Sequence, residues 1–122
     1  MKKILIIEDE KSLSDMYGAR FTKEGYAVVT AKTAQQGFEM AKAEHPDFIL
    51  LDILLLDSTG ITFLQYRDDD TEVSKIPVLA FSAYDNPETK KQARELGVLD
   101  YVIKTDYTPD QLTEKVQEYL TE

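Results

Sequence analysis

The sequence lacks cysteine, has one histidine, and carries far fewer basic than acidic residues. Its 122 residues include 14 Lys and Arg against 23 Asp and Glu, a net charge of -9. The absence of cysteine excludes disulfide bonds and thiolate metal sites. The negative charge argues against nucleic-acid binding by this chain alone, because a phosphate backbone would be repelled. The apolar run after Met1 is too short for a signal sequence or a membrane span, so we expect a cytoplasmic protein without membrane contact.

The chain has the size and composition of one soluble folded domain. Hydrophobic residues make up 43% of it and charged residues 30%, which is ordinary for a globular protein. A chain of 122 residues is long enough to bury a core. We see no linker, repeat or low-complexity segment, so residues 1–122 are expected to form a single domain.

Short apolar runs alternate with amphipathic segments along the chain. The runs are nearly continuous rather than alternating, which is typical of strands covered on both faces in a parallel sheet. We expect strands over 3–8, 26–31, 48–52, 77–81 and 100–103. We expect helices over 11–24 and 60–70, with three more beginning after the capping residues Thr33, Asn86 and Thr108.

Five strands that alternate with five helices predict an α/β fold with a parallel sheet. Right-handed crossovers leave few topologies, and among them we favour the flavodoxin-like (βα)5 three-layer sandwich with strand order 2-1-3-4-5. Gly25 and Gly97 are expected to end helices. Gly60 is expected in a tight loop that needs a positive φ angle, and the acids at 68–70 in a solvated loop.

Asp52 follows an apolar run, which is an expensive place for a carboxylate unless it is paired or binds a metal. Glu8 and Asp9 follow another apolar run, at the end of the first expected strand. In the favoured topology the carboxyl ends of the first and third strands flank the functional crevice. We therefore expect these three carboxylates to lie side by side.

Three carboxylates at close quarters repel one another. A pair about 4 Å apart costs roughly 4 kcal/mol at an effective dielectric constant near 20. One lysine does not neutralise three acids, whereas a divalent cation would, and an all-oxygen ligand set favours Mg2+. Ser82 and Lys104 close the fourth and fifth strands, where they would surround a phosphoryl group on Asp52.

These residues, in this order and spacing, resemble the receiver domain of two-component response regulators. The residues that carry the resemblance are Glu8-Asp9, Asp52, Gly60, Ser82-Ala83, Tyr101 and Lys104. The resemblance covers essentially the whole chain. It implies a signalling module that takes a phosphoryl group from a sensor histidine kinase or a histidine phosphotransfer protein and then engages a downstream protein target. It also implies that the protein catalyses only its own phosphorylation and dephosphorylation.

The resemblance also implies roles for the residues. Asp52 is similar to the phosphoacceptor and Lys104 to the lysine that pairs with the phosphoryl group. Glu8, Asp9, Asp52 and the backbone carbonyl of Leu54 resemble the Mg2+ ligands.

The remaining roles concern the switch. Ser82 resembles the switch hydroxyl that moves onto the phosphoryl group. Tyr101 is similar to the aromatic residue that swings inward when that hydroxyl moves. The face formed by the fourth helix, fifth strand and fifth helix would then change shape and control partner binding.

Two positions depart from the family pattern, and one neighbour of the site is unusual in size. Leu56 and Thr105 stand where proline is typical, and the peptide before Thr105 is usually cis. A cis bond before a non-proline residue costs about 2.5–4 kcal/mol, so either Lys104–Thr105 carries that strain or it is trans and the lysine is placed differently. Tyr84 borders Ser82-Ala83, and we predict that it shields the acyl phosphate from water.

The same residues also allow simpler, purely structural interpretations. Glu8 and Asp9 could cap the first helix, Asp52 and Lys104 could form a plain buried ion pair, and Tyr101 could be strand packing. A phosphatase with an Asp nucleophile needs an acid where Leu54 stands.

Two other functional classes use the same fold or the same residues. A flavin or nucleotide module needs a Gly-rich loop after the first strand, where this chain has acids. A pseudo-receiver scaffold that is not controlled by phosphorylation is the main alternative.

Overall fold

The computed structural model describes residues 1–55 and 59–121. The strands are β1 (Lys3–Ile7), β2 (Ala27–Ala31), β3 (Phe48–Asp52), β4 (Val78–Ser82) and β5 (Asp100–Ile103). The helices are α1 (Lys11–Lys23), α2 (Ala34–Glu44), α3 (Gly60–Asp68), α4 (Pro87–Glu95) and α5 (Pro109–Leu120), with short 3-10 turns η1 (Val73–Lys75) and η2 (Lys104–Asp106). The expected alternation of strands and helices is confirmed.

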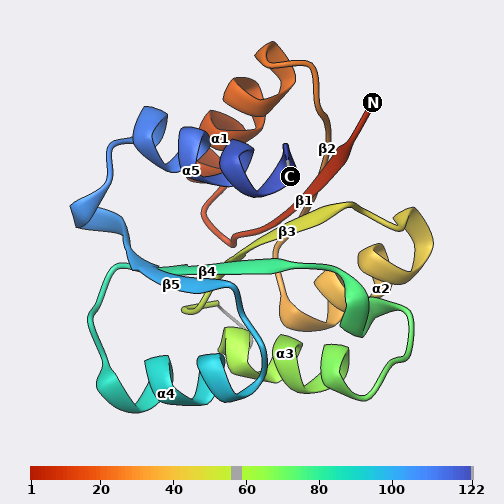
Figure 1. Cartoon of the computed structure of the whole chain (residues 1–122), viewed down its shortest axis with the longest axis vertical. Helices are drawn as coiled ribbons and strands as arrows, with labels where there is room; N and C mark the ends of the chain where they lie inside the picture. The colour runs from red at the N-terminus through yellow and green to blue at the C-terminus, as the bar shows by residue number, and fades with distance from the viewer. Residues whose placement is uncertain (56–58, 122) are drawn as a thin grey trace.

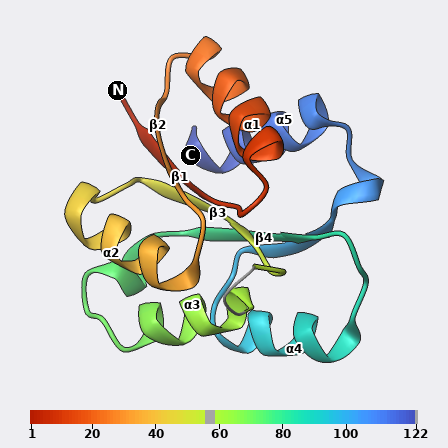
Figure 2. The same cartoon turned by 180° about the vertical axis from the view of Figure 1, so that it is seen from behind.

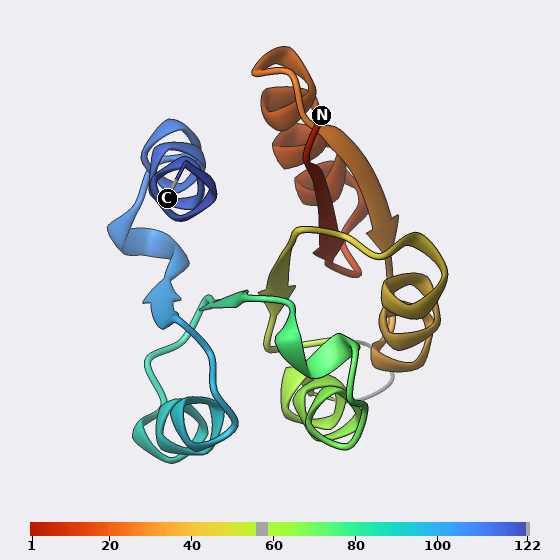
Figure 3. The same ribbon diagram turned by 45° about the vertical axis from the view of Figure 1, so that its right-hand side comes forward.

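The strands form one parallel sheet in the order β2-β1-β3-β4-β5. Helices α1 and α5 cover one face of this sheet, and α2, α3 and α4 cover the other (Figure 1). The view from behind and the view turned by 45° show the same three layers (Figures 2 and 3). The predicted flavodoxin-like fold and its strand order are therefore confirmed.

Alternate residues of the central strands face two separate hydrophobic clusters. On β1, Ile4 and Ile6 face the cluster under α1 and α5, while Leu5 and Ile7 face the cluster under α2, α3 and α4. Strands β3 and β4 are buried along their whole length. Burial on both faces explains why these strands read as continuous apolar runs in the sequence.

Capping residues set the helix ends largely as expected. Asn86 accepts hydrogen bonds from the first-turn amides of α4, and Thr108 forms a complete capping box with Gln111 at the start of α5. Gly25 and Gly97 have φ angles of 93° and 92°, a conformation that costs glycine little. The capping residues thus fix where the chain enters and leaves the layers.

The expectation for Gly60 was wrong in its reason. Gly60 is the first residue of α3, and the positive-φ glycines of the described residues are Gly25 and Gly97. Its lack of a side chain matters for space, because a Cβ there would lie 2.8 Å from the carbonyl oxygen of Asp52. Gly60 lets the start of α3 pass close to the end of β3.

The acids at the end of α3 also differ from expectation. Helix α3 ends at Asp68, and Asp70 is not simply solvated. The Asp70 carboxylate accepts hydrogen bonds from the amides of Glu72 and Val73, both at 2.9 Å, and lies 3.7 Å from Lys42 Nζ. The hydrogen bond from Val73 is the main cause of a lowered pKa for Asp70. This residue shapes the turn that leads to β4.

Two expectations concerned the positions where the family usually has proline. Leu56, one of the two missing prolines, lies outside the described residues. No peptide bond of the described residues is cis, so Lys104–Thr105 is trans.

None of the helices in 1–55 and 59–121 has the length and apolar character that crossing a bilayer requires.

Candidate functional site

The carboxyl ends of β1 and β3 bring three acidic side chains together. Glu8, Asp9 and Asp52 each offer an oxygen within 4.8 Å of the others. Glu8 and Asp52 are buried, with 2% and 3% exposure, and Asp9 is half-buried. The parallel pairing of β1 with β3 causes this convergence, because both strands end at the same edge of the sheet. The predicted meeting of these three carboxylates is confirmed.

Lys104 brings one positive charge to the acids from the end of β5. Its Nζ donates to Asp52 Oδ2 at 3.1 Å and to Glu8 Oε2 at 3.3 Å. Its Nζ also lies 4.7 Å from the ring centroid of Phe81, so an aromatic face adds to its environment. The trans peptide after Lys104 therefore still lets the ammonium reach both buried carboxylates.

The electrostatics of the cluster are unbalanced. Burial, followed by the hydrogen bond and charge of Asp52, raises the pKa of Glu8 from 4.5 to about 8, and Lys104 only partly opposes this. Burial alone would lower the pKa of Lys104, but the Asp52 and Glu8 carboxylates raise it overall. A single lysine thus leaves an excess of negative charge that a cation would stabilise.

Backbone amides fix the carboxylates that face this cluster. Glu8 Oε1 accepts from the amide of Glu10, and Asp52 Oδ1 accepts from the amide of Leu54, both at 3.1 Å. Glu10 is the N-cap residue of α1, and its side chain makes no capping hydrogen bond. The hypothesis that Glu8 and Asp9 cap α1 therefore accounts for one contact only, the hydrogen bond from the Glu10 amide to Glu8. These bonds hold each carboxylate in one orientation.

Residues 53–54 and 59–60 contact each other next to Asp52. The amide of Gly60 donates to the carbonyl of Ile53 at 2.7 Å, and Leu54 bridges Thr59. Leu54 has 46% exposure, so the chain next to Asp52 reaches the surface. An oxygen set of carboxylates is the kind that Mg2+ prefers, and the three acids are close enough together to share one ion. The residues present therefore fit a magnesium ion.

Ser82 and Tyr101 lie on the neighbouring strands β4 and β5. Ser82 is buried, and its Oγ accepts from the amide of Tyr84 at 3.2 Å. Tyr101 pairs with Ala80 and belongs to the cluster under α2, α3 and α4. The Tyr101 ring is already inside, at 4% exposure, and its hydroxyl is buried without a hydrogen-bond partner among the described residues.

The remaining predicted residues lie at the rim. Ala83 and Tyr84 follow Ser82 at the surface, and Tyr84 has 68% exposure. His45, the single histidine, is exposed at the end of α2, where it adopts a left-handed conformation. Sequence reasoning missed Phe81, whose position under Lys104 depends on its pairing opposite Asp52 and Val102. The only sequence signal for it was its place beside Ser82.

Residues 4–117 match the response regulator receiver domain family. The chain belongs to this family. Such domains act in two-component signalling and are not classical enzymes. The match covers the residues from β1 to the last turns of α5, so it includes every member of the cluster described above.

Relatives and solved structures agree with this assignment. The polar-differentiation response regulator DivK of Brucella ovis is 27% identical over 119 residues, covering 98% of this chain and 96% of the relative. The probable transcriptional regulator ycf27 of Cyanophora paradoxa is 30% identical over 121 residues, covering 98% of this chain but 48% of that protein. A CheY-like receiver domain from Methanospirillum hungatei has a TM-score of 0.89 at 27% identity, covering 99% of this chain and 94% of its own.

Proposed function

We propose that this receiver domain accepts a phosphoryl group on Asp52 from a phosphohistidine of a sensor histidine kinase or a histidine phosphotransfer protein. The observation that carries the proposal is the contact of Lys104 with both Asp52 and Glu8, in a cluster that Asp9 completes. A carboxylate in this position is buried, oriented by a backbone amide, and next to a cation. Those are the properties of an activated aspartate nucleophile.

In the proposed reaction, an Asp52 carboxylate oxygen forms a bond to phosphorus. The bond from phosphorus to the histidine nitrogen breaks, and the nitrogen keeps the electron pair. Lys104 pairs with the phosphoryl oxygens and limits the repulsion between the incoming group and Glu8. Hydrolysis of the acyl phosphate later returns Asp52 to its starting state.

Magnesium fits the acidic part of the pocket. We propose that Glu8, Asp9, Asp52 and the backbone carbonyl of Leu54 would hold the ion, with Glu8 acting largely through water. When bound, Mg2+ supplies positive charge that stabilises a phosphoryl group as it transfers. The ion would also offset the negative charge of Asp52, which after burial is a further cause of the raised pKa of Glu8.

The switch would begin at Ser82. A phosphoryl group adds about -1.5 to -2 charge and strong acceptor oxygens, which attract the Ser82 hydroxyl away from the amide of Tyr84. The loop from Ser82 to Asn86 leads directly into α4, so its movement changes the face of α4, β5 and α5. Because the Tyr101 ring is already inside, we propose that phosphorylation stabilises this position rather than creating it. A downstream protein would read the altered face.

Intact mass spectrometry tests the proposal directly. The protein is incubated with acetyl phosphate and Mg2+, and we expect a mass gain of one phosphoryl group. Asp52→Ala should show no gain, whereas Asp69→Ala, which removes an exposed acid elsewhere, should behave as the parent. A parent protein without any gain would instead support the pseudo-receiver scaffold. A gain that persists in Asp52→Ala would move the phosphoacceptor to another residue.

A further inference from the structure

Lys104 contacts an aromatic ring as well as two carboxylates. Its Nζ lies 4.7 Å from the centroid of the Phe81 ring, in addition to its hydrogen bonds to Asp52 and Glu8 at 3.1 and 3.3 Å. Phe81 is fully buried, and the side chain of Lys104 is 18% exposed. A cation over an aromatic face and largely removed from water is attracted by the negative charge density of the ring. Three groups therefore hold the ammonium.

The register of the sheet places this ring beside the carboxylate cluster of Glu8, Asp9 and Asp52. Phe81 pairs with Asp52 on one side and with Val102 on the other. Residues paired across neighbouring strands point to the same face, so the ring and the Asp52 carboxylate share a face of the sheet. Lys104 follows Val102 by two residues, a spacing that returns a side chain to the same face of a strand. Strand pairing thus brings ring, acid and ammonium together.

Tyr17, on α1, packs against the Phe81 ring. The two ring centroids lie 5.7 Å apart with an angle of 87° between the planes, which is an edge-to-face arrangement. Burial raises the pKa of the Tyr17 hydroxyl, and the charges of Lys104 and Glu8 also act on this pKa, in opposite directions. The second ring therefore lies close to the charged cluster and restricts the movement of the first. We call Phe81 and Tyr17 the aromatic shelf.

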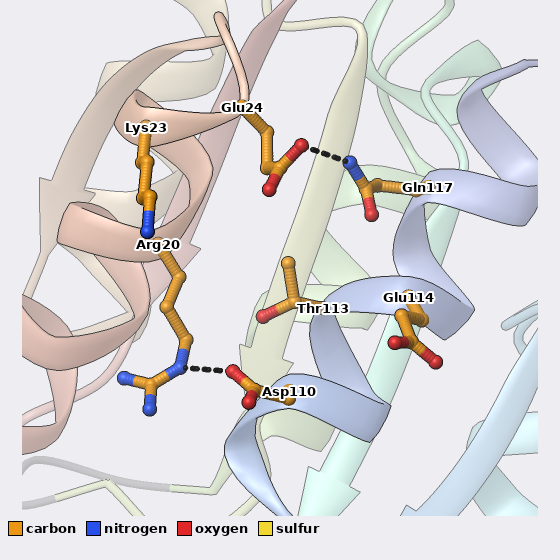
Figure 4. Close-up of a pocket in the computed structure, with 7 residues that line it drawn as sticks. All are labelled: Arg20, Lys23, Glu24, Asp110, Thr113, Glu114 and Gln117. Carbon is orange, nitrogen blue, oxygen red and sulfur yellow. Dashed lines mark hydrogen bonds and ion pairs between the residues drawn. The ribbon is translucent and has the colours of Figure 1, made fainter.

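The helix that carries Tyr17 is joined to α5. Arg20 donates to Asp110 at 2.9 Å and Gln117 donates to Glu24 at 3.4 Å, across a pocket of about 420 Å3 between the two helices (Figure 4). Surface contacts of this kind add little stability, but they show that α1 lies against α5 at this point. The aromatic shelf thus rests on a helix that is itself packed against a second helix.

We propose that Phe81, supported by Tyr17, is a positioning residue that keeps the ammonium of Lys104 beside Asp52 while the carboxylates change partners. This inference rests on the proposed function. A bound Mg2+ would compete with Lys104 for the two buried carboxylates, and phosphorylation of Asp52 would convert one of them into an acyl phosphate. The attraction between a ring and a cation depends on neither carboxylate. The shelf therefore holds Lys104 when its acidic partners are engaged elsewhere.

The backbone at Lys104 does not fix the side chain. Strand β5 ends at Ile103, and Lys104 begins the short turn η2 with a trans peptide to Thr105. A lysine side chain is a flexible four-carbon stem that samples many rotamers unless its end is held. Without the ring, only a fraction of molecules would keep Nζ beside Asp52 in the presence of Mg2+. The rate of phosphoryl transfer would fall with that fraction.

NMR of the lysine side chains tests the contact itself. The full chain is labelled with 13C at the lysine ε positions, and Lys104→Arg identifies the Lys104 signal by its loss. We expect the ε protons of Lys104 to lie upfield of those of the other lysines, with and without Mg2+, because they are over the face of a ring. A Lys104 signal that lies among the other lysine signals in the parent would overturn the proposal.

A matched pair of variants assigns the upfield shift to its ring. Phe81→Leu should abolish the shift. Phe63→Leu should keep it, because Phe63 is also fully buried but belongs to the cluster on the opposite face of the sheet, under α2, α3 and α4. Loss of the shift in both variants, or in neither, would contradict the assignment.

Phosphorylation rates test what the contact does. Intact mass follows the gain of a phosphoryl group from acetyl phosphate at saturating Mg2+. We expect Phe81→Leu to slow the gain about threefold to tenfold, the effect of losing a cation–ring attraction of ordinary size. Phe63→Leu should stay within about twofold of the parent, since distant sites act independently. Tyr17→Leu should fall between them, because Phe81 keeps its face but loses its support. Equal rates in Phe81→Leu and Phe63→Leu would overturn the positioning role.

Fluorinated phenylalanine separates the electrostatics of the ring from its shape, and it applies even where Phe81→Leu does not fold. Fluorine withdraws electron density from the face of the ring and so weakens its attraction for a cation, while the ring keeps nearly the same size. Mono-, di- and trifluorinated phenylalanine in place of Phe81 should slow the mass gain in that order. The same series in place of Phe63 should leave the rate unchanged. A flat series at Phe81 would overturn the proposal.

The two kinds of measurement separate this inference from the proposed function. The upfield shift of Lys104 requires no phosphoryl transfer. Its presence in a parent protein that gains no mass would therefore overturn the proposed function and leave the contact with Phe81 standing. A parent protein that gains mass at a rate independent of the Phe81 ring would overturn the positioning role alone.

Discussion

Two buried charged sites in this protein are built in opposite ways. Arg67, on α3, is 7% exposed, and Lys104, directly after β5, contacts the buried carboxylates of Glu8 and Asp52. Arg67 has backbone carbonyls as its hydrogen-bond partners: Nε and Nη2 donate to Ile76 at 3.1 and 2.8 Å, and Nη1 donates to Leu96 at 3.2 Å. Burial lowers the pKa of Arg67, yet the guanidinium keeps its charge.

The contrast teaches how structural and functional charges differ. The Arg67 site is satisfied, since its donors reach the carbonyls of Ile76 and Leu96, the residues that cap the ends of η1 and α4. The pocket of Glu8, Asp9 and Asp52 is left with more negative charge than Lys104 offsets. A satisfied site stabilises the fold, whereas an unbalanced one suits the cation and the phosphoryl group that we propose for it.

Replacing Arg67 should have the largest effect on stability. Arg67→Met removes a hydrogen-bonded group and leaves buried carbonyls without donors, so we expect a loss of about 3 kcal/mol in the free energy of unfolding. Urea denaturation measures it. Arg94→Met, at an exposed arginine, should change stability by about 0.5 kcal/mol or less. Equally small losses of unfolding free energy in both variants would contradict the prediction, because the hydrogen bonds of Arg67 would then contribute little to stability.

Magnesium should have the next largest effect, and on the unbalanced site alone. Mg2+ at tenfold or more above its Kd should stabilise the protein by about 1 to 2 kcal/mol, because it binds the folded state and relieves carboxylate repulsion. Thermal unfolding with and without millimolar Mg2+ measures this. Asp9→Ala should lose most of the shift, while Arg67→Met should keep it, since distant sites act additively. A melting temperature that Mg2+ leaves unmoved in the parent would contradict the metal site.

Tyr101 supplies an intermediate case, a buried polar group that is neither satisfied nor charged. Its hydroxyl has no hydrogen-bond partner among the described residues. Tyr101→Phe should therefore stabilise the fold by about 1 kcal/mol, because an unpaired buried hydroxyl is removed and the ring remains. Tyr66→Phe, at a residue with 38% exposure, should have an effect near zero in the same urea experiment. Destabilisation by Tyr101→Phe would show that the hydroxyl has a favourable partner.

The contrast between the two sites also shows what the sequence could predict. The carboxylate pocket was predictable because it follows from strand order: Glu8, Asp9, Asp52 and Lys104 stand at the ends of apolar runs, and parallel strands end at one edge. The capping residues Asn86 and Thr108 were readable because capping acts over a few residues. Both kinds of signal are local or follow directly from topology.

Arg67 was not predicted, although it shares the helical spacing of the buried Phe63 and Leu64. Spacing alone places it toward the core, but its partners at Ile76 and Leu96 are brought there by the packing of three elements. Gly60 was noticed for the wrong reason, since its close approach to Asp52 is a tertiary contact rather than a backbone angle. Contacts of this kind depend on tertiary packing, which local sequence patterns do not reveal.

The smallest expected effect concerns Tyr84, which lies beside the carboxylate cluster. The amide of Tyr84 donates to Ser82 Oγ, so the residue adjoins Ser82, yet its side chain is 68% exposed. We predict that the ring screens the acyl phosphate from water and that Tyr84→Ala shortens its half-life about two- to fivefold, a barrier change under about 1 kcal/mol. The decay of the phosphorylated mass measures this, with Tyr66→Ala as the control. Equal half-lives in Tyr84→Ala and the parent would contradict the prediction and show that the Tyr84 ring does not screen the acyl phosphate.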